Sequence, residues 1–248
     1  MRSLLVGLAL CALPASALAQ APRKFPPDSL VNTKVIPHNT PVPQVLGMMR
    51  NFAGDLGVRC QFCHVGEEGQ PLDRFNFASD DKRTKLVARQ MMLMLQEVNR
   101  RLDTIPRAST AAVPATCATC HRGVSRPVPL YAVMTDAATA GGADSAVRSY
   151  RALRERYYGR DAYDFGETSL NTAAFRLARA GKYDDALALL RLNEELFPRS
   201  SGMYVFRGNI DLMRADTAAA AAAFREAVRR DSTNQEARGR LQAIGQRP

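Results

Sequence analysis

The chain carries CQFCH at residues 60–64 and CATCH at residues 117–121, two copies of the pattern C-x-x-C-H. Two thiols about one helical turn apart can form thioethers with the two vinyl groups of a porphyrin, and the adjacent imidazole can bind its iron. The pattern therefore predicts two covalently attached c-type haems. The predicted attachment and iron-binding residues are Cys60, Cys63, His64, Cys117, Cys120 and His121.

Two other uses of paired cysteines fit this chain poorly. A redox disulfide needs no histidine after its second cysteine, yet both pairs have one. A zinc ribbon brings two pairs close together in sequence, whereas 53 residues separate Cys63 from Cys117. Covalent haem accounts for both the spacing and the histidines.

The N-terminal residues predict export. Residues 1–19 combine a basic start, an apolar run over 4–13 and a small-residue end, which is typical of a cleaved secretory signal. The apolar run is too short to span a bilayer, and no later stretch is long and apolar enough to anchor the mature chain. Cys11 leaves with the signal, so the remaining four cysteines all lie in the two motifs. We therefore expect a periplasmic or extracellular protein without a structural disulfide.

The charge excludes little by itself. The formal net charge is +10, and removal of the signal deletes one charged residue, Arg2. The propionates of two haems offset part of this excess, so the charge is weak support for nucleic-acid binding, which the export signal also disfavours. An acidic redox partner or an anionic membrane surface remains open, and solvated helix faces account for most of the scattered arginines.

The segment before the first motif predicts an extended arm and then a helix. Residues 20–41 are rich in proline, which suits an arm that lies over a folded body. Apolar residues then recur at helical spacing from near Pro43 to Leu56, and Gly57 is placed to end the helix. Met49 lies on the apolar face of this helix, and Met48 is rotated about 100° away from it.

A second helix is predicted between the motifs, with Asp80 and Asp81 as its N-terminal caps. Lys85 and Arg89 fall outside its apolar stripe. The residues expected to face inward are Val87, Met91, Met94, Leu95, Val98 and Leu102. The order of helix, loop and haem motif thus occurs twice.

Each iron bound by one histidine needs a second axial ligand, and the chain has one further histidine, His38. Thioether sulfur is the natural alternative. Met49 stands 11 residues before Cys60, and Met94 stands 23 before Cys117. A methionine on an apolar stripe also serves as ordinary core packing, so spacing alone leaves both roles open.

Three segments, residues 56–64, 88–99 and 117–123, resemble the cytochrome c subunit of photosynthetic reaction centres. The resemblance covers about residues 43–131. It implies that each haem lies parallel to the helix before its motif and that a methionine of that helix is the distal ligand. Alignment on Leu56 and Gly57 selects Met49, and alignment on Asn99 selects Met94. A one-residue difference in spacing keeps Met91 open as a substitute for Met94, and Met48 stays open beside Met49.

The chain also departs from that family. The family subunit carries four haems, whereas this chain has two motifs and matches one half of it. Docking to a reaction centre is therefore not implied. The chain is more similar to the related stand-alone dihaem cytochromes that use the same half.

The C-terminal half resembles tetratricopeptide repeats. From residue 169 onward, an offset of 34 residues superposes small and large apolar positions. A trailing helix over 234–245 suits a cap, and an earlier helix over 143–158 suits an incomplete first unit. Residues 124–144, with two prolines and a Gly-Gly pair, are the expected linker. The repeats serve either as a docking surface or as a stabilising cap.

We therefore predict an all-α protein with a signal peptide (1–19), a dihaem domain (20–134) and a repeat domain (135–248). Two six-coordinate haems have no open site, which favours an outer-sphere relay between a redox donor and an acceptor over an enzyme. Two alternatives remain. One is a haem-stacked filament, in which His38 reaches the iron of a neighbouring subunit. The other is a dihaem peroxidase, for which no catalytic constellation is evident.

Overall fold

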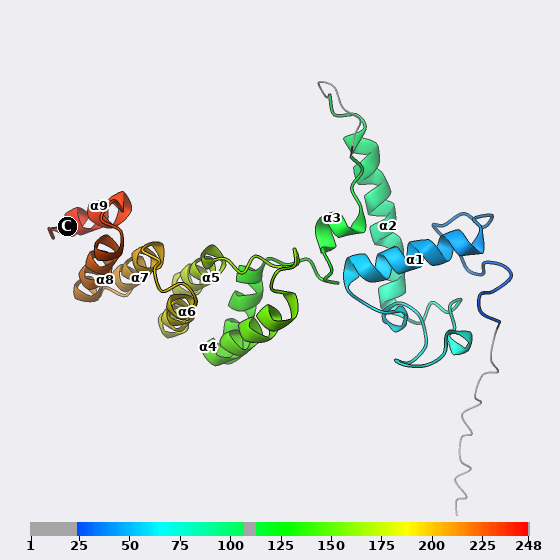
Figure 1. The fold of residues 1–248 in the computed structure, drawn as a ribbon, viewed down its shortest axis with the longest axis horizontal. Coiled ribbons are helices and arrows are strands. Elements are labelled where there is room, and N and C mark those ends of the chain that lie inside the picture. Colours follow the sequence, from blue (N-terminus) through cyan, green and yellow to red (C-terminus); the bar gives the residue numbers. More distant parts are fainter. Residues whose placement is uncertain (1–23, 107–112, 248) are drawn as a thin grey trace, which may run out of the picture. The chain divides into compact units, whose positions relative to one another are not determined.

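The computed structural model describes residues 24–106 and 113–247. These residues form helices connected by turns and loops, with a single isolated β-bridge between Val65 and Asn76 and no strand (Figure 1). The predicted all-α class is confirmed. None of the helices described combines the length and the apolar character needed to cross a bilayer. The predicted signal at 1–19 lies outside the described residues.

The contacts divide the chain into two compact units. Among the described residues, the first comprises 24–53, 58–106 and 113–115, and the second comprises Gly54–Gly57 and residues 116–247. The second C-x-x-C-H motif is thereby grouped with the C-terminal helices. The boundary at 134/135 remains a prediction about which segments fold independently.

The first unit contains α1 (Val42–Leu56) as far as Ala53, and all of η1 (Cys60–Phe62), η2 (Leu72–Arg74) and α2 (Arg83–Leu102). The α1 helix begins and ends where the sequence predicted, and Gly57 follows it with a φ of 63°. Only glycine adopts this left-handed conformation without a steric cost, so the helix stops there. The described part of the arm, residues 24–41, is non-helical and contacts α2 through Asn32, whose carbonyl accepts from Arg89.

The predicted start of α2 is wrong by a few residues. The helix begins at Arg83, and Lys82 precedes it without a side-chain cap. Asp80 does not cap the helix because its carboxylate pairs with Lys85 and Arg89, at 3.1 and 3.0 Å. Two cations on the first turns of α2 compete more strongly for this carboxylate than backbone amides do.

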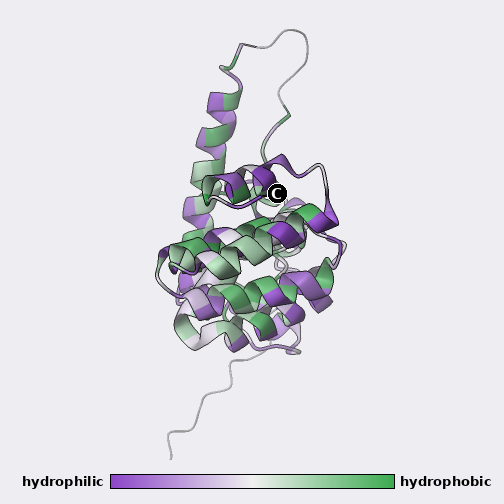
Figure 2. Cartoon of the chain, turned by 90° about the vertical axis from the view of Figure 1, so that its left-hand side faces the viewer, coloured by the Kyte–Doolittle hydropathy of each residue, from purple (hydrophilic) through white to green (hydrophobic). Residues whose placement is uncertain are grey.

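The prediction that the apolar stripe of α2 faces inward is also wrong, because the side chains of the described residues do not bury it. The helix α2, upright at the upper left of Figure 2, has green hydrophobic residues interspersed with purple hydrophilic ones along its length. Met94 is 50% exposed, and the buried residue of α2 is Lys85. No described segment of the first unit covers the stripe. Its exposed members are Val87, Met91, Met94 and Val98, and its half-buried members are Leu95 and Leu102.

The second unit is a run of helices from the second motif to the C-terminal end (Figure 1). Successive helices pack against each other from α4 to α9. The α6 and α8 helices begin 34 residues apart and end 34 residues apart, which is the predicted repeat length. The helices are α3 (Cys117–His121), α4 (Leu130–Tyr157), α5 (Glu167–Arg179), α6 (Tyr183–Leu196), α7 (Gly202–Met213), α8 (Thr217–Arg230) and α9 (Gln235–Ala243).

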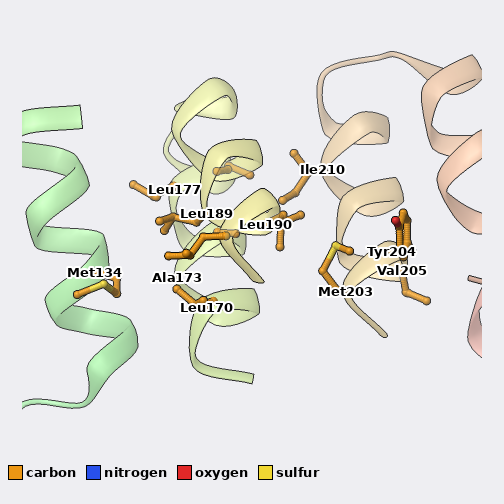
Figure 3. Close-up of a cluster of buried hydrophobic side chains, with 14 of the residues drawn as sticks. Met134, Leu170, Ala173, Leu177, Leu189, Leu190, Met203, Tyr204, Val205 and Ile210 are labelled. Atoms are coloured by element: carbon orange, nitrogen blue, oxygen red, sulfur yellow. The ribbon is translucent and has the colours of Figure 1, made fainter. Parts of the chain in front are cut away.

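One continuous hydrophobic core joins α4 to α9. Figure 3 shows its side chains between successive helices, with Met134 from α4, Leu177 from α5 and Leu189 from α6 among them. Each helix buries one apolar stripe against its neighbours, which is how stacked repeats obtain a core that one repeat lacks.

The expected linker is partly helical. The α4 helix begins at Leu130, and its first half packs into the core through Met134. The Gly141-Gly142 pair bends α4 instead of separating domains, since Gly142 has a φ of 71°. Two side chains at the start of α6 support the bend: Lys182, which precedes the helix, donates to the Thr139 carbonyl at 3.2 Å, and Asp185 accepts from the Ala143 amide at 2.8 Å. The Lys182 ammonium binds a carbonyl at the end of the first half of α4, and the Asp185 carboxylate binds an amide at the start of the second half, as the helix dipole favours.

Candidate haem sites

The first motif is wound into a helical turn. The amides of Cys63 and His64 both donate to the Cys60 carbonyl, at 3.2 and 2.9 Å. This turn carries the two thiols about one helical turn apart, with the imidazole directly after them. All four motif cysteines are free thiols, and Cys60 is exposed. The backbone thus carries the two thiols and the imidazole on one turn, as the motif predicts.

His64 is held as a neutral imidazole. Burial, followed by repulsion from the Lys85 ammonium, lowers its pKa to about 4, and the Phe77 carbonyl opposes this shift. The buried Nδ1 atom makes no hydrogen bond of normal geometry, so that carbonyl acts on the ring as a nearby dipole. The Phe77 ring meets the imidazole edge-on, with centroids 4.9 Å apart. A neutral imidazole is the form that binds iron.

The second motif forms the short helix α3. At its start, the Thr116 amide donates to the Thr119 hydroxyl at 2.9 Å. At its end, Arg122 takes a left-handed conformation with a φ of 49° and closes the helix directly after the histidine. Each motif is therefore wound into a helical turn, which is a 3-10 turn at the first motif and α-helical at the second.

His121 is buried and has an oriented ring. Its Nδ1 lies 2.9 Å from the Val124 carbonyl, which has no proton to give. Nδ1 must therefore donate, so the lone pair is on Nε2. A backbone carbonyl on the far nitrogen fixes the tautomer and orientation of metal-binding histidines in the same way.

Close packing of two glycines holds the second motif against the end of α1. The Gly123 amide donates to the Asp55 carbonyl at 2.8 Å. A Cβ on Gly57 would lie 2.0 Å from the Gly123 carbonyl oxygen. Gly57 is thus needed twice, for its positive φ and for this approach.

We predict that Gly57→Ala lowers the free energy of unfolding by at least about 2 kcal/mol. The left-handed backbone costs an alanine about 1–2 kcal/mol, and displacement of the Gly123 carbonyl adds about 1–3 kcal/mol. Gly54→Ala is the matched control, because Gly54 lies within α1 and a Cβ there meets open space. It should leave stability unchanged or raise it by up to about 1 kcal/mol. Urea unfolding of both variants measures the difference, and equal midpoints would contradict the prediction.

The cysteine environments do not suit a redox-active dithiol. Burial raises the pKa of Cys63, and the neighbouring Cys60 adds to the shift. Burial and then Asp55 raise the pKa of Cys117. Reactive cysteines have lowered pKa values, because the thiolate is the nucleophile.

The methionines proposed as distal ligands lie on helices of the first unit. Met49 and Met48 are both half-buried on α1, so burial does not distinguish them. Met94 and Met91 are exposed on α2. Asn99, one turn beyond Met94, accepts from the Ala115 amide at 2.7 Å and donates to its carbonyl at 3.0 Å. This pair ties α2 to the backbone two residues before Cys117.

The remaining histidine, His38, is exposed in the N-terminal arm. Its Nδ1 lies 2.9 Å from the Thr33 hydroxyl. His38 is thus an exposed loop histidine with a local partner. Its role as a ligand in a neighbouring subunit stays untested.

Sequence analysis missed three contributors to these sites. Lys85 was placed on the outer side of α2, yet it is buried beside the loop that carries Phe77. The Val124 carbonyl is a backbone group and leaves no trace in side-chain patterns. Gly123 had a detectable signal, since a glycine two residues after a motif histidine is typical of a turn.

The comparisons with known proteins agree with this geometry. Residues 60–157 match the family described as photosynthetic reaction centre cytochrome C subunit, and this region runs from the first motif to the end of α4. The reaction center cytochrome c subunit of Thermochromatium tepidum is 42% identical over 77 residues, which are 31% of this chain and 16% of that protein. That of Roseobacter denitrificans is 38% identical over 86 residues, 34% of this chain and 22% of that protein. Cytochrome c-554 of Chloroflexus aurantiacus is 36% identical over 75 residues, which are 30% of this chain and 16% of that protein.

The resemblance predicted from the motifs is thus confirmed. This chain spans between about a sixth and about a fifth of the length of these relatives. No solved structure matches it. The tetratricopeptide character of the C-terminal half stays a prediction, supported by the 34-residue offset between α6 and α8.

Proposed function

We propose that this protein is a c-type cytochrome that holds two covalently attached haems and relays electrons between redox proteins. The observation that carries this proposal is the arrangement of the two C-x-x-C-H motifs. Each lies on a helical turn and ends in a histidine whose ring is neutral, at His64, or oriented by a backbone carbonyl, at His121. A haem held at each motif supplies a one-electron iron couple.

The residues present fit two haems. Cys60 and Cys63 would attach the first, and Cys117 and Cys120 the second, because each pair offers free thiols on one turn. His64 and His121 would be the proximal ligands, and a buried Nδ1 of His64 without a hydrogen bond of normal geometry is compatible with that role. These groups would supply the two thioether attachments and the imidazole ligand that each c-type haem uses.

Met49 and Met94 are the proposed distal ligands, on the basis of the family resemblance. The exposed apolar stripe of α2 supports a haem beside Met94, because large exposed apolar surface marks a site of contact with another apolar group. With both axial positions held by protein, the chain offers substrates no open iron site. We therefore propose outer-sphere electron transfer and no enzymatic role. Methionine ligation also favours a higher potential than a second histidine would.

We further propose that the protein works in the periplasm or outside the cell, after removal of residues 1–19. Covalent haem attachment and the absence of other cysteines in the mature chain are compatible with that compartment. Its partners are then a redox donor and an acceptor protein. The helices α4–α9, with exposed arginines such as Arg151, Arg176 and Arg207, are a candidate docking surface for one of them.

Optical spectroscopy of ligand variants tests this function. The mature protein, made with haem-attachment machinery, should carry two haems per chain, remain low-spin in both oxidation states and show the weak far-red band of methionine bound to ferric iron. Met49→Leu and Met94→Leu should each remove about half of that band. Met48→Leu and Met91→Leu are matched controls and should leave it intact.

Other outcomes would revise the proposal. Loss of the band in Met48→Leu or Met91→Leu would reassign that ligand. A high-spin haem in the unmodified protein would reject the six-coordinate relay and favour an enzyme. Absence of covalent haem would reject the cytochrome itself.

A further inference from the structure

The buried cation of α2 has an unusual set of partners. Lys85 is 9% exposed, and its Nζ donates to the carbonyls of Phe77 and Ser79, at 2.8 and 2.7 Å, with the Ala78 carbonyl at 3.3 Å. The Asp80 carboxylate lies 3.1 Å away and balances the charge. A buried ammonium is tolerated only when its three protons find acceptors, and here they do. Lys85 therefore gathers three successive carbonyls of one loop.

A second cation of α2 binds the end of the same loop, residues 77–80, and the N-terminal arm. Arg89, one turn after Lys85, donates to Asp80 at 3.0 Å and to the Asn32 carbonyl at 2.9 Å. The Asn32 side chain in turn donates to the Ala78 carbonyl at 2.6 Å. Residues 77–80 are thus held between α2 and the N-terminal arm, and their backbone has little freedom to move.

The loop residue held most directly, Phe77, is the one that contacts His64. Its ring meets the imidazole edge-on at 4.9 Å and is stacked on Phe75 with centroids 5.5 Å apart and an interplanar angle of 19°. Phe25, from the arm, packs on Phe77 at 5.5 Å. Phe75 is itself buried, so this aromatic cluster is a firm support behind the imidazole.

The two motif histidines are held by different means. His121 has a backbone carbonyl on Nδ1, whereas His64 has no hydrogen bond there and depends on the packing of Phe77. Anything that sets the position of Phe77 therefore sets the orientation of the His64 ring.

We propose that Lys85 is a positioning residue for His64: by binding the carbonyls of residues 77–79, it fixes Phe77 against the imidazole and so sets the orientation of the first proximal ligand. This proposal rests on the proposed function and deepens it. Its effect is confined to the first haem, because Lys85, Phe77 and His64 lie in one compact unit and His121 has its own hydrogen bond. The orientation of a ligand ring affects the redox potential of the iron it binds, as other contacts made by the ligand do.

Lys85→Met in the full-length dihaem protein tests the proposal. Proton NMR of the oxidised protein gives hyperfine-shifted imidazole resonances for each haem, assigned with a variant that lacks one motif's cysteines. We expect the His64 resonances and the midpoint potential of the first haem to shift, and those of the second haem to stay. Lys85→Arg keeps a donor cation, so its His64 resonances should shift less than those of Lys85→Met.

A charge control separates positioning from electrostatics. Lys82 lies beside the same motif, where its charge acts on Cys63, but it makes no described side-chain contact with residues 77–79. Lys82→Met should leave the His64 resonances unchanged. If Lys82→Met and Lys85→Met shift them equally, positioning is rejected in favour of a charge effect.

A second variant covers the case in which Lys85→Met does not fold. Phe77→Leu keeps the backbone carbonyls and removes the ring that supports His64, so the same first-haem resonances should shift. Unchanged resonances in Phe77→Leu, or in a folded Lys85→Met protein with both haems, would overturn the proposal. Failure of the proposed function is distinct, because the unmodified protein would then lack two haem signals.

Discussion

Replacing Cys60 and Cys63 together with alanine should halve the covalently bound haem, from two per chain to one. Both thioethers of the first site are lost, while the second motif keeps its own thiols on α3 and its oriented His121. Intact-protein mass and iron content per chain measure the result. The large effect follows from chemistry, since the cysteines outside the predicted signal all lie in the two motifs and thioether formation then has no substitute donor.

The reciprocal variant, Cys117→Ala with Cys120→Ala, is the matched control. It should also leave one haem, and the optical spectra of the two single-haem proteins should sum to that of the unmodified protein if the sites are independent. A single-motif variant that still carries two covalent haems, or an unmodified chain that carries one, would contradict the two-site assignment.

Removing all four motif cysteines should unfold the first unit and leave the C-terminal helices folded. The described hydrophobic side chains buried in the first unit are Val45 and Phe75, whereas the second unit has a continuous core from α4 to α9. Ordering each residue costs about 1–2 kcal/mol of backbone entropy. Burial of one large apolar side chain contributes only about 1.5–3 kcal/mol. Two such side chains are too few, so the first unit needs the surface that a haem would bury.

Hydrogen exchange on the cysteine-free chain measures this difference between the units. Amides of α1 and α2 should exchange rapidly, and those of α5–α8 should remain protected, because exchange follows local stability. The haem-loaded protein is the comparison and should protect both units. Protected α1 and α2 amides without haem would show that the first unit folds on its own contacts.

The helices and their chemistry were largely predictable because they depend on local patterns. The C-x-x-C-H spacing predicted six candidate site residues. The apolar periodicity predicted a helix from near Pro43 to Leu56, where α1 spans Val42–Leu56. The 34-residue offset matches the bounds of α6 and α8. Patterns of this kind are properties of the chain itself, since side chains three or four positions apart share a helix face wherever the helix packs.

The sequence-based predictions were wrong where a residue had more than one possible partner. Asp80 was expected to cap α2, but Lys85 and Arg89 bind it instead. Residues 124–144 were predicted to be a linker, but from Leu130 onward they are helical. Leu130 and Met134 are buried in the hydrophobic core of the second unit, which stabilises this part of α4. Prolines and glycines indicate a break in the chain, and only the packing partners decide whether that break is a linker or a bend.

The sequence by itself determined the two C-x-x-C-H motifs, the all-α class and the helical periods, because thiol spacing and side-chain periodicity are local. Only the tertiary structure decided what surrounds each histidine. It placed the Val124 carbonyl on His121, and it buried Lys85 against the loop that presses Phe77 on His64. These contacts join backbone groups and side chains that no short pattern relates. They form because a buried ammonium or imidazole must find whatever acceptor the folded chain brings within reach.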